Sequence, residues 1–238
     1  MALNPALSIR QGLVAYWPLA GAAAVDLKSG LSDGGGPYDL TDGNTVTRAA
    51  GPGANLPNAA SFASATSESL TRAVAASPNL VRGGKGSFEI NGWVFVADAA
   101  AASRTIISQY ETTSNQRAWW AFFGSGGSTI TWRTSVDGTN NVDTTVGVAG
   151  ASTWAFITVY FDSRGVQGGM LNLTAPTETA QTGIFASTGA FAFGSRGSGA
   201  DYFNGRLAHF SLHERLLTSA ERFWLYNNGA GRDLTRGA

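Results

Sequence analysis

Short apolar and aromatic runs, separated by turns rich in Gly, Ser, Thr, Asn and Asp, extend along nearly the whole chain. Such runs, either alternating with polar residues or continuous, are typical of β-strands joined by tight turns. Clear examples are residues 87–96 (SFEINGWVFV), 153–161 (TWAFITVYF) and 203–213 (FNGRLAHFSLH). Residues 13–19 are apolar at successive positions, which indicates a strand covered on both faces. The pattern predicts an all-β protein.

One helix is predicted near the C-terminus, over residues 219–227. Thr218 is followed three residues later by Glu221, the spacing of a capping box in which each side chain satisfies a free backbone amide. Phe223, Leu225 and Tyr226 are placed to face a sheet, and a glycine follows at position 229.

Both ends of the chain resemble one family. Residues 12–30 (GLVAYWPLAGAAAVDLKSG) and 203–231 (FNGRLAHFSLHERLLTSAERFWLYNNGAG) resemble the first and last strands of concanavalin A-like, laminin G-like jelly-roll domains. The resemblance implies an antiparallel two-sheet β-sandwich with one short C-terminal helix, in which strand 12–19 lies next to 203–213. We therefore divide the chain into an N-terminal arm (1–11), a jelly-roll domain (12–231) and a C-terminal tail (232–238).

The charge is low and balanced, with 16 basic and 16 acidic residues and a net charge of zero. Fourteen of the cations are Arg, and they form no basic cluster, so neither nucleic acid nor an anionic membrane is an expected partner. There is no cysteine, and the first residues lack the features of a signal peptide. From this we expect a protein that is made in a host cytoplasm and is not exported by a cleavable signal.

No catalytic constellation emerges from the acidic residues and histidines. Glycoside hydrolysis needs two carboxylates at a defined separation, and no glutamate has an acid two residues away. His209 and His213 fall on a predicted strand, where a four-residue spacing is too long to share an ion, and we expect them on its wetter face. We predict no enzyme activity and no cofactor.

Some laminin G-like domains hold calcium, and the resemblance places Asp26 where such a site has an acid. Ala208 stands where the resemblance leads us to expect the second acid, and an alanine side chain supplies no oxygen ligand. We therefore predict no metal site.

Binding remains, through either aromatic side chains or the N-terminal arm. Trp119 and Trp120 are adjacent and must point to opposite faces of a strand, so one of the two rings can lie on an outer face with Trp132 or Tyr110 nearby. We take Trp119, Trp132 and Tyr110 as candidates for a glycan platform or an interface. Leu3, Leu7 and Ile9 give the arm an apolar side that could dock on a neighbour.

Two functions follow from these features. Our main interpretation is a non-enzymatic structural protein of a bacteriophage virion, which decorates a capsid or tail, self-associates in the assembly and contacts capsid or tail proteins. The alternative is a carbohydrate-binding module or host-surface adhesin that binds a cell-surface glycan.

Overall fold

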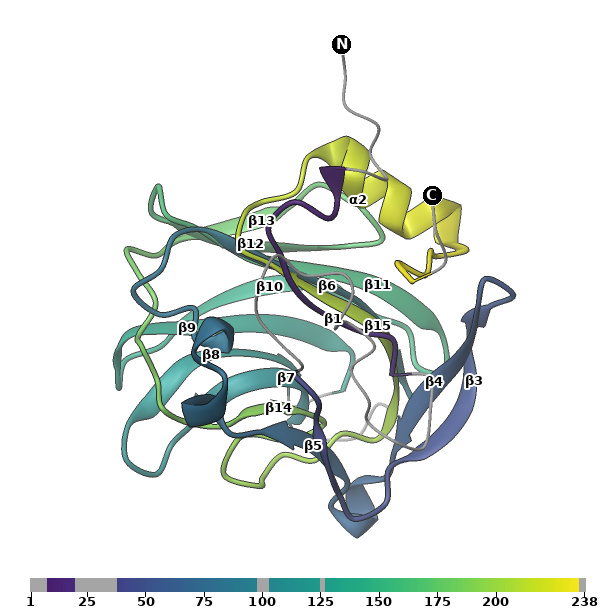
Figure 1. Cartoon of the computed structure of the whole chain (residues 1–238), viewed down its shortest axis with the longest axis horizontal. Helices are drawn as coiled ribbons and strands as arrows, with labels where there is room; N and C mark the ends of the chain where they lie inside the picture. The colour runs from purple at the N-terminus through teal and green to yellow at the C-terminus, as the bar shows by residue number, and fades with distance from the viewer. Residues whose placement is uncertain (1–7, 20–37, 98–102, 125–126, 236–238) are drawn as a thin grey trace.

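A computed structural model describes residues 8–19, 38–97, 103–124 and 127–235 of the chain. Two antiparallel sheets pack face to face as a β-sandwich, which confirms the predicted fold class (Figure 1). The eight-stranded sheet has the order β13-β12-β11-β6-β15-β4-β3, with β1 paired to β15. Its strands are β1 (Leu13–Trp17), β3 (Thr47–Gly53), β4 (Leu56–Phe62), β6 (Phe88–Val96), β11 (Trp154–Asp162), β12 (Val166–Leu171), β13 (Thr177–Ala180) and β15 (Gly205–His213).

The seven-stranded sheet has the order β10-β9-β8-β7-β14-β5-β2. Its strands are β2 (Thr41–Gly43), β5 (Ser69–Arg72), β7 (Arg104–Glu111), β8 (Gln116–Phe123), β9 (Thr129–Gly138), β10 (Val142–Val148) and β14 (Phe191–Phe193). Short 3-10 turns, η2 (Ser64–Thr66), η3 (Val74–Ala76), η4 (Pro78–Leu80) and η5 (Asn227–Gly229), lie between the other elements.

Strand β1 pairs with the second half of β15, as the sequence predicts for the two ends of the domain. The first half of β15 pairs with β4, and a bulge separates the two halves. His209 lies at this bulge with a left-handed φ of 53°, and its backbone N–H donates to the carbonyl of Pro18 at 3.0 Å. Because the bulge redirects β15, one strand edge serves two partners in succession.

The space between the sheets is filled largely by aromatic rings. Trp17 stacks on Phe191 with ring centroids 5.0 Å apart, and Trp119 lies 5.8 Å from Trp132. All four side chains are buried, and they pack with aliphatic residues of both sheets. All five residues of β1 are buried as well, because the outer face of the eight-stranded sheet is also covered, which confirms the prediction for this strand.

A second core on that outer face lies beneath α2 (Ser219–Tyr226), which crosses one end of the sheet (Figure 1). Thr218 and Glu221 form the predicted capping box. Leu225 and Tyr226 face the sheet as predicted, and the Tyr226 ring stacks at 5.8 Å on that of Trp93. The prediction for Phe223 is wrong, since its side chain points outward and is 55% exposed.

The two histidines are buried, so the prediction that they lie on a wetter face is also wrong. His213 has no exposed surface, and His209 is 7% exposed. The reason is tertiary, because the segments around Ile9 and Leu234 fold back over the outer side of β15 and join the second core. No helix in the described part of the chain has the length and apolar character needed to cross a membrane.

Candidate functional site

The three aromatic residues predicted as a ligand platform are buried. Trp119 and Trp132 lie in the core between the sheets, where the Trp132 indole N–H donates to the Tyr160 carbonyl at 3.1 Å. Tyr110 is on the outer face of the seven-stranded sheet, packed beside Trp120 with a centroid distance of 5.1 Å. A ring without exposed surface cannot stack on a ligand unless the sheet opens, so any platform of the folded protein must use other aromatic residues.

Trp119 and Trp120 do point to opposite faces of β8, as adjacent residues of a strand must. The outward ring, Trp120, is covered by two guanidinium groups, those of Arg133 at 5.5 Å and Arg196 at 5.6 Å from its centroid. Arg133 in turn forms a bidentate ion pair with Asp143, with N–O distances of 2.6 and 2.7 Å. This arginine and aromatic face is therefore internally paired, and Trp120 is only 4% exposed.

The predicted docking residues have different positions. Ile9 is fully buried in the second core, under the helix of its own domain. Leu3 and Leu7 lie outside the described residues, as does Asp26. Ala208 is buried in the second core as well. Within the described segments, His, Asp and Glu side chains form no group of three that could hold a metal ion.

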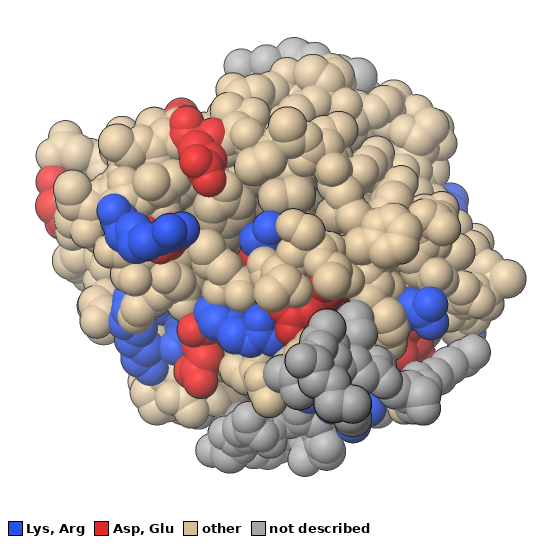
Figure 2. All heavy atoms as spheres, turned by 90° about the horizontal axis from the view of Figure 1, so that it is seen from above, with Lys and Arg blue, Asp and Glu red and all other residues tan. Residues whose placement is uncertain are grey.

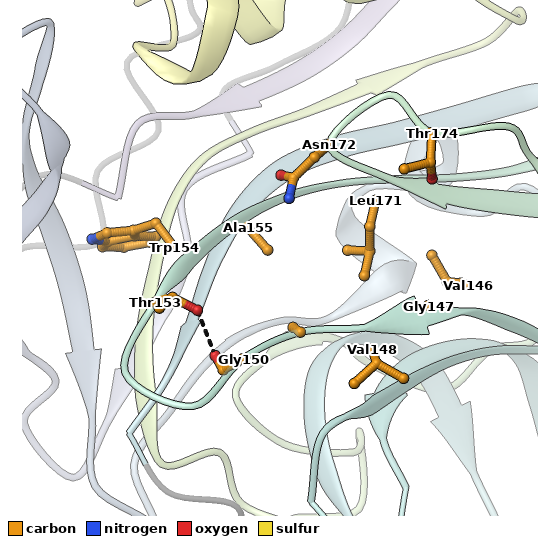
Figure 3. A pocket seen from close by; sticks show the side chains of 11 residues that line it. Val146, Gly147, Val148, Gly150, Thr153, Trp154, Ala155, Leu171, Asn172 and Thr174 are labelled. Atoms are coloured by element: carbon orange, nitrogen blue, oxygen red, sulfur yellow. Dashed lines mark hydrogen bonds between the residues drawn. The ribbon is translucent and has the colours of Figure 1, made fainter.

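An accessible hollow lies at the edge of the sandwich, where β10 of one sheet approaches β11 and β12 of the other (Figure 3). We call it the edge hollow; it has a volume of about 260 Å³. Its lining residues are Val146, Gly147, Val148, Ala149, Gly150, Thr153, Trp154, Ala155, Leu171, Asn172 and Thr174. The buried side chains of Val146, Ala155 and Leu171 also belong to the main core, so its apolar part is continuous with the interior.

The polar rim of the edge hollow is held rigidly. The Asn172 backbone N–H donates to the Phe156 carbonyl at 2.8 Å, and the Phe156 N–H donates to the Asn172 Oδ1 at 2.9 Å. This double contact fixes the Asn172 side chain, and among the described residues its Nδ2 group has no hydrogen-bond acceptor. Thr153 donates its hydroxyl to the Gly150 carbonyl at 2.7 Å, and the exposed Thr174 lies at the other end (Figure 3).

Trp154 borders the hollow at the end opposite Thr174 (Figure 3). Its ring is half-buried and lies 5.5 Å from that of Phe95, which is also half-buried on the outer face of the eight-stranded sheet. The Arg206 guanidinium covers Phe95 at 4.6 Å from the ring centroid. These contacts hold the Trp154 ring on the outer face of the eight-stranded sheet, where it points away from the other lining residues of the hollow (Figure 3) and stays partly accessible beside the rim.

The edge hollow is uncharged, since none of its lining residues is acidic or basic. It also contains no histidine, so it offers no general acid or base. In the view of Figure 2, charged side chains gather on one part of the surface, and a broad area beside them has none. The geometry suits hydrogen bonding to a neutral polar ligand with apolar contact below.

Sequence reasoning missed this site. Trp154 occurs in a run that was interpreted only as a strand, and its half-exposure follows from its place as the first residue of β11. One available signal was the turn at Asn172 and Leu173, because glycine is the usual second residue of such a turn. Both residues have left-handed φ values, 47° and 58°.

Comparison with known proteins identifies the fold alone. No protein-family model matches the sequence, and no curated protein matches it. Among solved structures, the binding domain of botulinum neurotoxin serotype C1 superposes with a TM-score of 0.66 at 14% identity, over 93% of this chain and 53% of that one. The binding domain of Paraclostridial Mosquitocidal Protein 1 gives a TM-score of 0.69 at 14% identity, over 92% of this chain and 52% of that one.

A third match is a botulinum neurotoxin type C structure whose title describes cell entry that depends on two ganglioside molecules. Its TM-score is 0.61 at 14% identity, over 94% of this chain and 52% of that one. The present chain thus spans about half the length of each of these toxin binding domains. The chain shares their β-sandwich fold, and the jelly-roll architecture implied by the resemblance at its two ends agrees with it.

Proposed function

We propose that this chain is a non-enzymatic binding module for a cell-surface glycan, with the edge hollow as its site. The observation that carries the proposal is a rigid, uncharged polar rim above an apolar floor, with a partly exposed tryptophan beside the rim on the outer face of the sheet. Sugar rings present hydroxyl groups at their edges and apolar C–H faces, and this combination matches both. The carbohydrate-binding alternative predicted from the sequence is therefore the function we favour.

The comparisons support a binding role without specifying the ligand. The matched structures are binding domains of toxins, and one of them is described with gangliosides. This chain covers only about half of each of those structures. The comparison therefore supports a binding role in general and no particular contact residue. These matches lend no support to the virion role, so a capsid or tail location with capsid partners stays a prediction.

A glycan array probed with the labelled protein tests the proposal, followed by calorimetry on the best ligand. Trp154→Ala should reduce affinity by about tenfold or more, because it removes the aromatic border. Asn172→Asp keeps the oxygen that accepts from Phe156 and removes the Nδ2 donor, so a similar loss is expected.

The matched control is Trp224→Ala, which changes a half-buried tryptophan of α2 outside the edge hollow. It should leave affinity unchanged. Absence of binding to every neutral and sialylated glycan on the array would contradict the proposed function, as would equal losses for Trp154→Ala and Trp224→Ala.

A further inference from the structure

A second hollow adjoins the first at the β12–β13 connection. We call it the helix hollow; it has a volume of about 460 Å³ and lies between that connection and α2. Its lining residues are Met170, Leu173, Thr174, Ala175, Pro176, Ser219, Arg222 and Phe223. Thr174 lines both hollows, so the two meet at this residue.

The helix hollow contains an exposed aromatic side chain. Phe223 is 55% exposed, whereas Leu225 and Tyr226 of the same helix pack toward the sheet. The capping box at Thr218 fixes the start of the helix and with it the position of Phe223. An exposed ring on a rigid helix, beside the Ser219 hydroxyl, repeats at this end the pairing of aromatic and polar groups found around Trp154.

The helix hollow contains one charged residue, and that charge is already paired. The Arg222 guanidinium donates to both carboxylate oxygens of Glu89 at 2.9 and 2.6 Å. Glu89 has no exposed surface, so this ion pair belongs to the interior and leaves no free charge for a ligand. Both hollows are therefore suited to a neutral ligand.

One wall of the helix hollow is formed by a leucine whose backbone conformation is unfavourable for a residue with a Cβ. Leu173 has a φ of 58°, a region that is unfavourable for a residue with a Cβ and in which glycine is the usual choice. Its side chain packs against the second core and lines the helix hollow. A leucine at this position supplies an apolar wall that a glycine would lack.

We infer that the ligand is an uncharged oligosaccharide of several rings, which runs from Trp154 across Thr174 to Phe223. The inference rests on the proposed function and adds the ligand's length and charge. Size supports it: ligand pockets commonly measure roughly 300–1,000 Å³. The edge hollow at about 260 Å³ falls just below that range, and the two hollows joined fall inside it.

The test is calorimetry with the full chain and three neutral series, cello-, malto- and N-acetylchito-oligosaccharides, each from disaccharide to hexasaccharide. At least one series should bind, and its affinity should rise about tenfold or more with length before it levels off. Phe223→Ala should remove most of that gain and leave disaccharide affinity unchanged. The matched control is Val136→Ala, which changes a valine of β9 that is similarly exposed, at 50%, outside both hollows.

Three results would overturn the inference without contradicting glycan binding. The first is an affinity that does not depend on oligosaccharide length, and the second is an equal loss of affinity for short and long sugars in Phe223→Ala. The third is tighter binding of sialyllactose, which is charged, than of neutral lactose. Failure of every series and of both lactose forms would instead count against the proposed function itself, and the inference would fall with it.

Discussion

His213 is the residue whose ionisation is most altered by the fold. It is fully buried, and its Nε2 lies 3.1 Å from the Ile9 carbonyl oxygen. Burial, together with the nearby positive charge of Arg215, lowers the pKa of His213 from its ordinary value of 6.5 to about 3. The unfolded chain therefore binds a proton on this residue below pH 6.5, and the folded protein does not bind one until about pH 3.

Stability should consequently fall as the pH is lowered from 7 to 5. The unfolded state takes up the proton in this window, and each pKa unit corresponds to about 1.4 kcal/mol, so we expect a loss of about 2 kcal/mol in the free energy of unfolding. Urea unfolding at several pH values measures it. His213→Gln, which cannot titrate, should show a flatter profile, and identical slopes for the two proteins would contradict the assignment.

The prediction for His213 is limited to pH 5–7 because, at lower pH, the carboxyl group of Glu221 also changes the free energy of unfolding. Burial acts to raise the pKa of Glu221, but hydrogen bonds from Arg215 and from the Thr218 backbone outweigh it and lower this pKa to about 2. That contribution is present above pH 4.5 and is lost only as the pH falls toward 2. The profile above pH 5 is therefore free of it.

At the scale of elements, the N-terminus of α2 depends on a few polar contacts. The Thr218 hydroxyl accepts from the Glu221 N–H at 3.2 Å, and the Glu221 carboxylate accepts from the Thr218 N–H at 2.7 Å. Arg215 pairs with the same carboxylate at 2.7 Å. These contacts join the end of β15 to the helix that covers the second core.

Thr218→Ala should lower the free energy of unfolding by about 1 kcal/mol, the usual effect of losing an N-terminal cap. Denaturant unfolding near pH 7 measures the change. Ser219→Ala changes the next residue, whose side chain makes no capping bond, and should have little effect on stability. A cost for Ser219→Ala as large as that for Thr218→Ala would show that the capping box does not stabilise the helix.

At the scale of the whole molecule, the described ends of the chain close the domain together. Arg215 donates to the carbonyls of Ser8 at 2.7 Å and Gln11 at 2.8 Å. Arg10 donates to the Leu234 carbonyl at 3.5 Å, so residues of the predicted arm and the predicted tail meet. From Ser8 onward the arm is thus part of the domain.

Deleting residues 1–11 should therefore destabilise the domain, because the contacts of Ser8, Ile9 and Gln11 with the rest of the domain are lost. The loss of buried Ile9 alone corresponds to roughly 1.5–3 kcal/mol. Thermal or urea unfolding provides the measurement, with a deletion of residues 1–7 as the matched control because it retains the contacts from Ser8 onward. Equal stability of the two truncated proteins would contradict the packing of Ile9.

The sequence by itself determined several strands, among them 87–96, 153–161 and 203–213, together with the capped helix and the neighbouring first and last strands, because these depend on local periodicity, turn residues and the pattern at the two ends. It also required Trp119 and Trp120 to face opposite ways, since successive side chains alternate across a strand. The alternation of side chains does not predict how exposed each ring is, because exposure depends on which other side chains cover the ring. Trp120 is covered by arginines from β9 and from the loop after β14, which only the tertiary structure brings over it.

The candidate site shows the same limit more strongly. Trp154 and Asn172 border one hollow only because β11 and β12 pair in one sheet, and Val148 lines it from the edge of the other sheet. The local sequence pattern cannot predict that these residues line one hollow, because this depends on how the two sheets pack at their edges. The sequence determined several of the segments that form strands, and only the packing of the sheets decided which side chains remain accessible to a ligand.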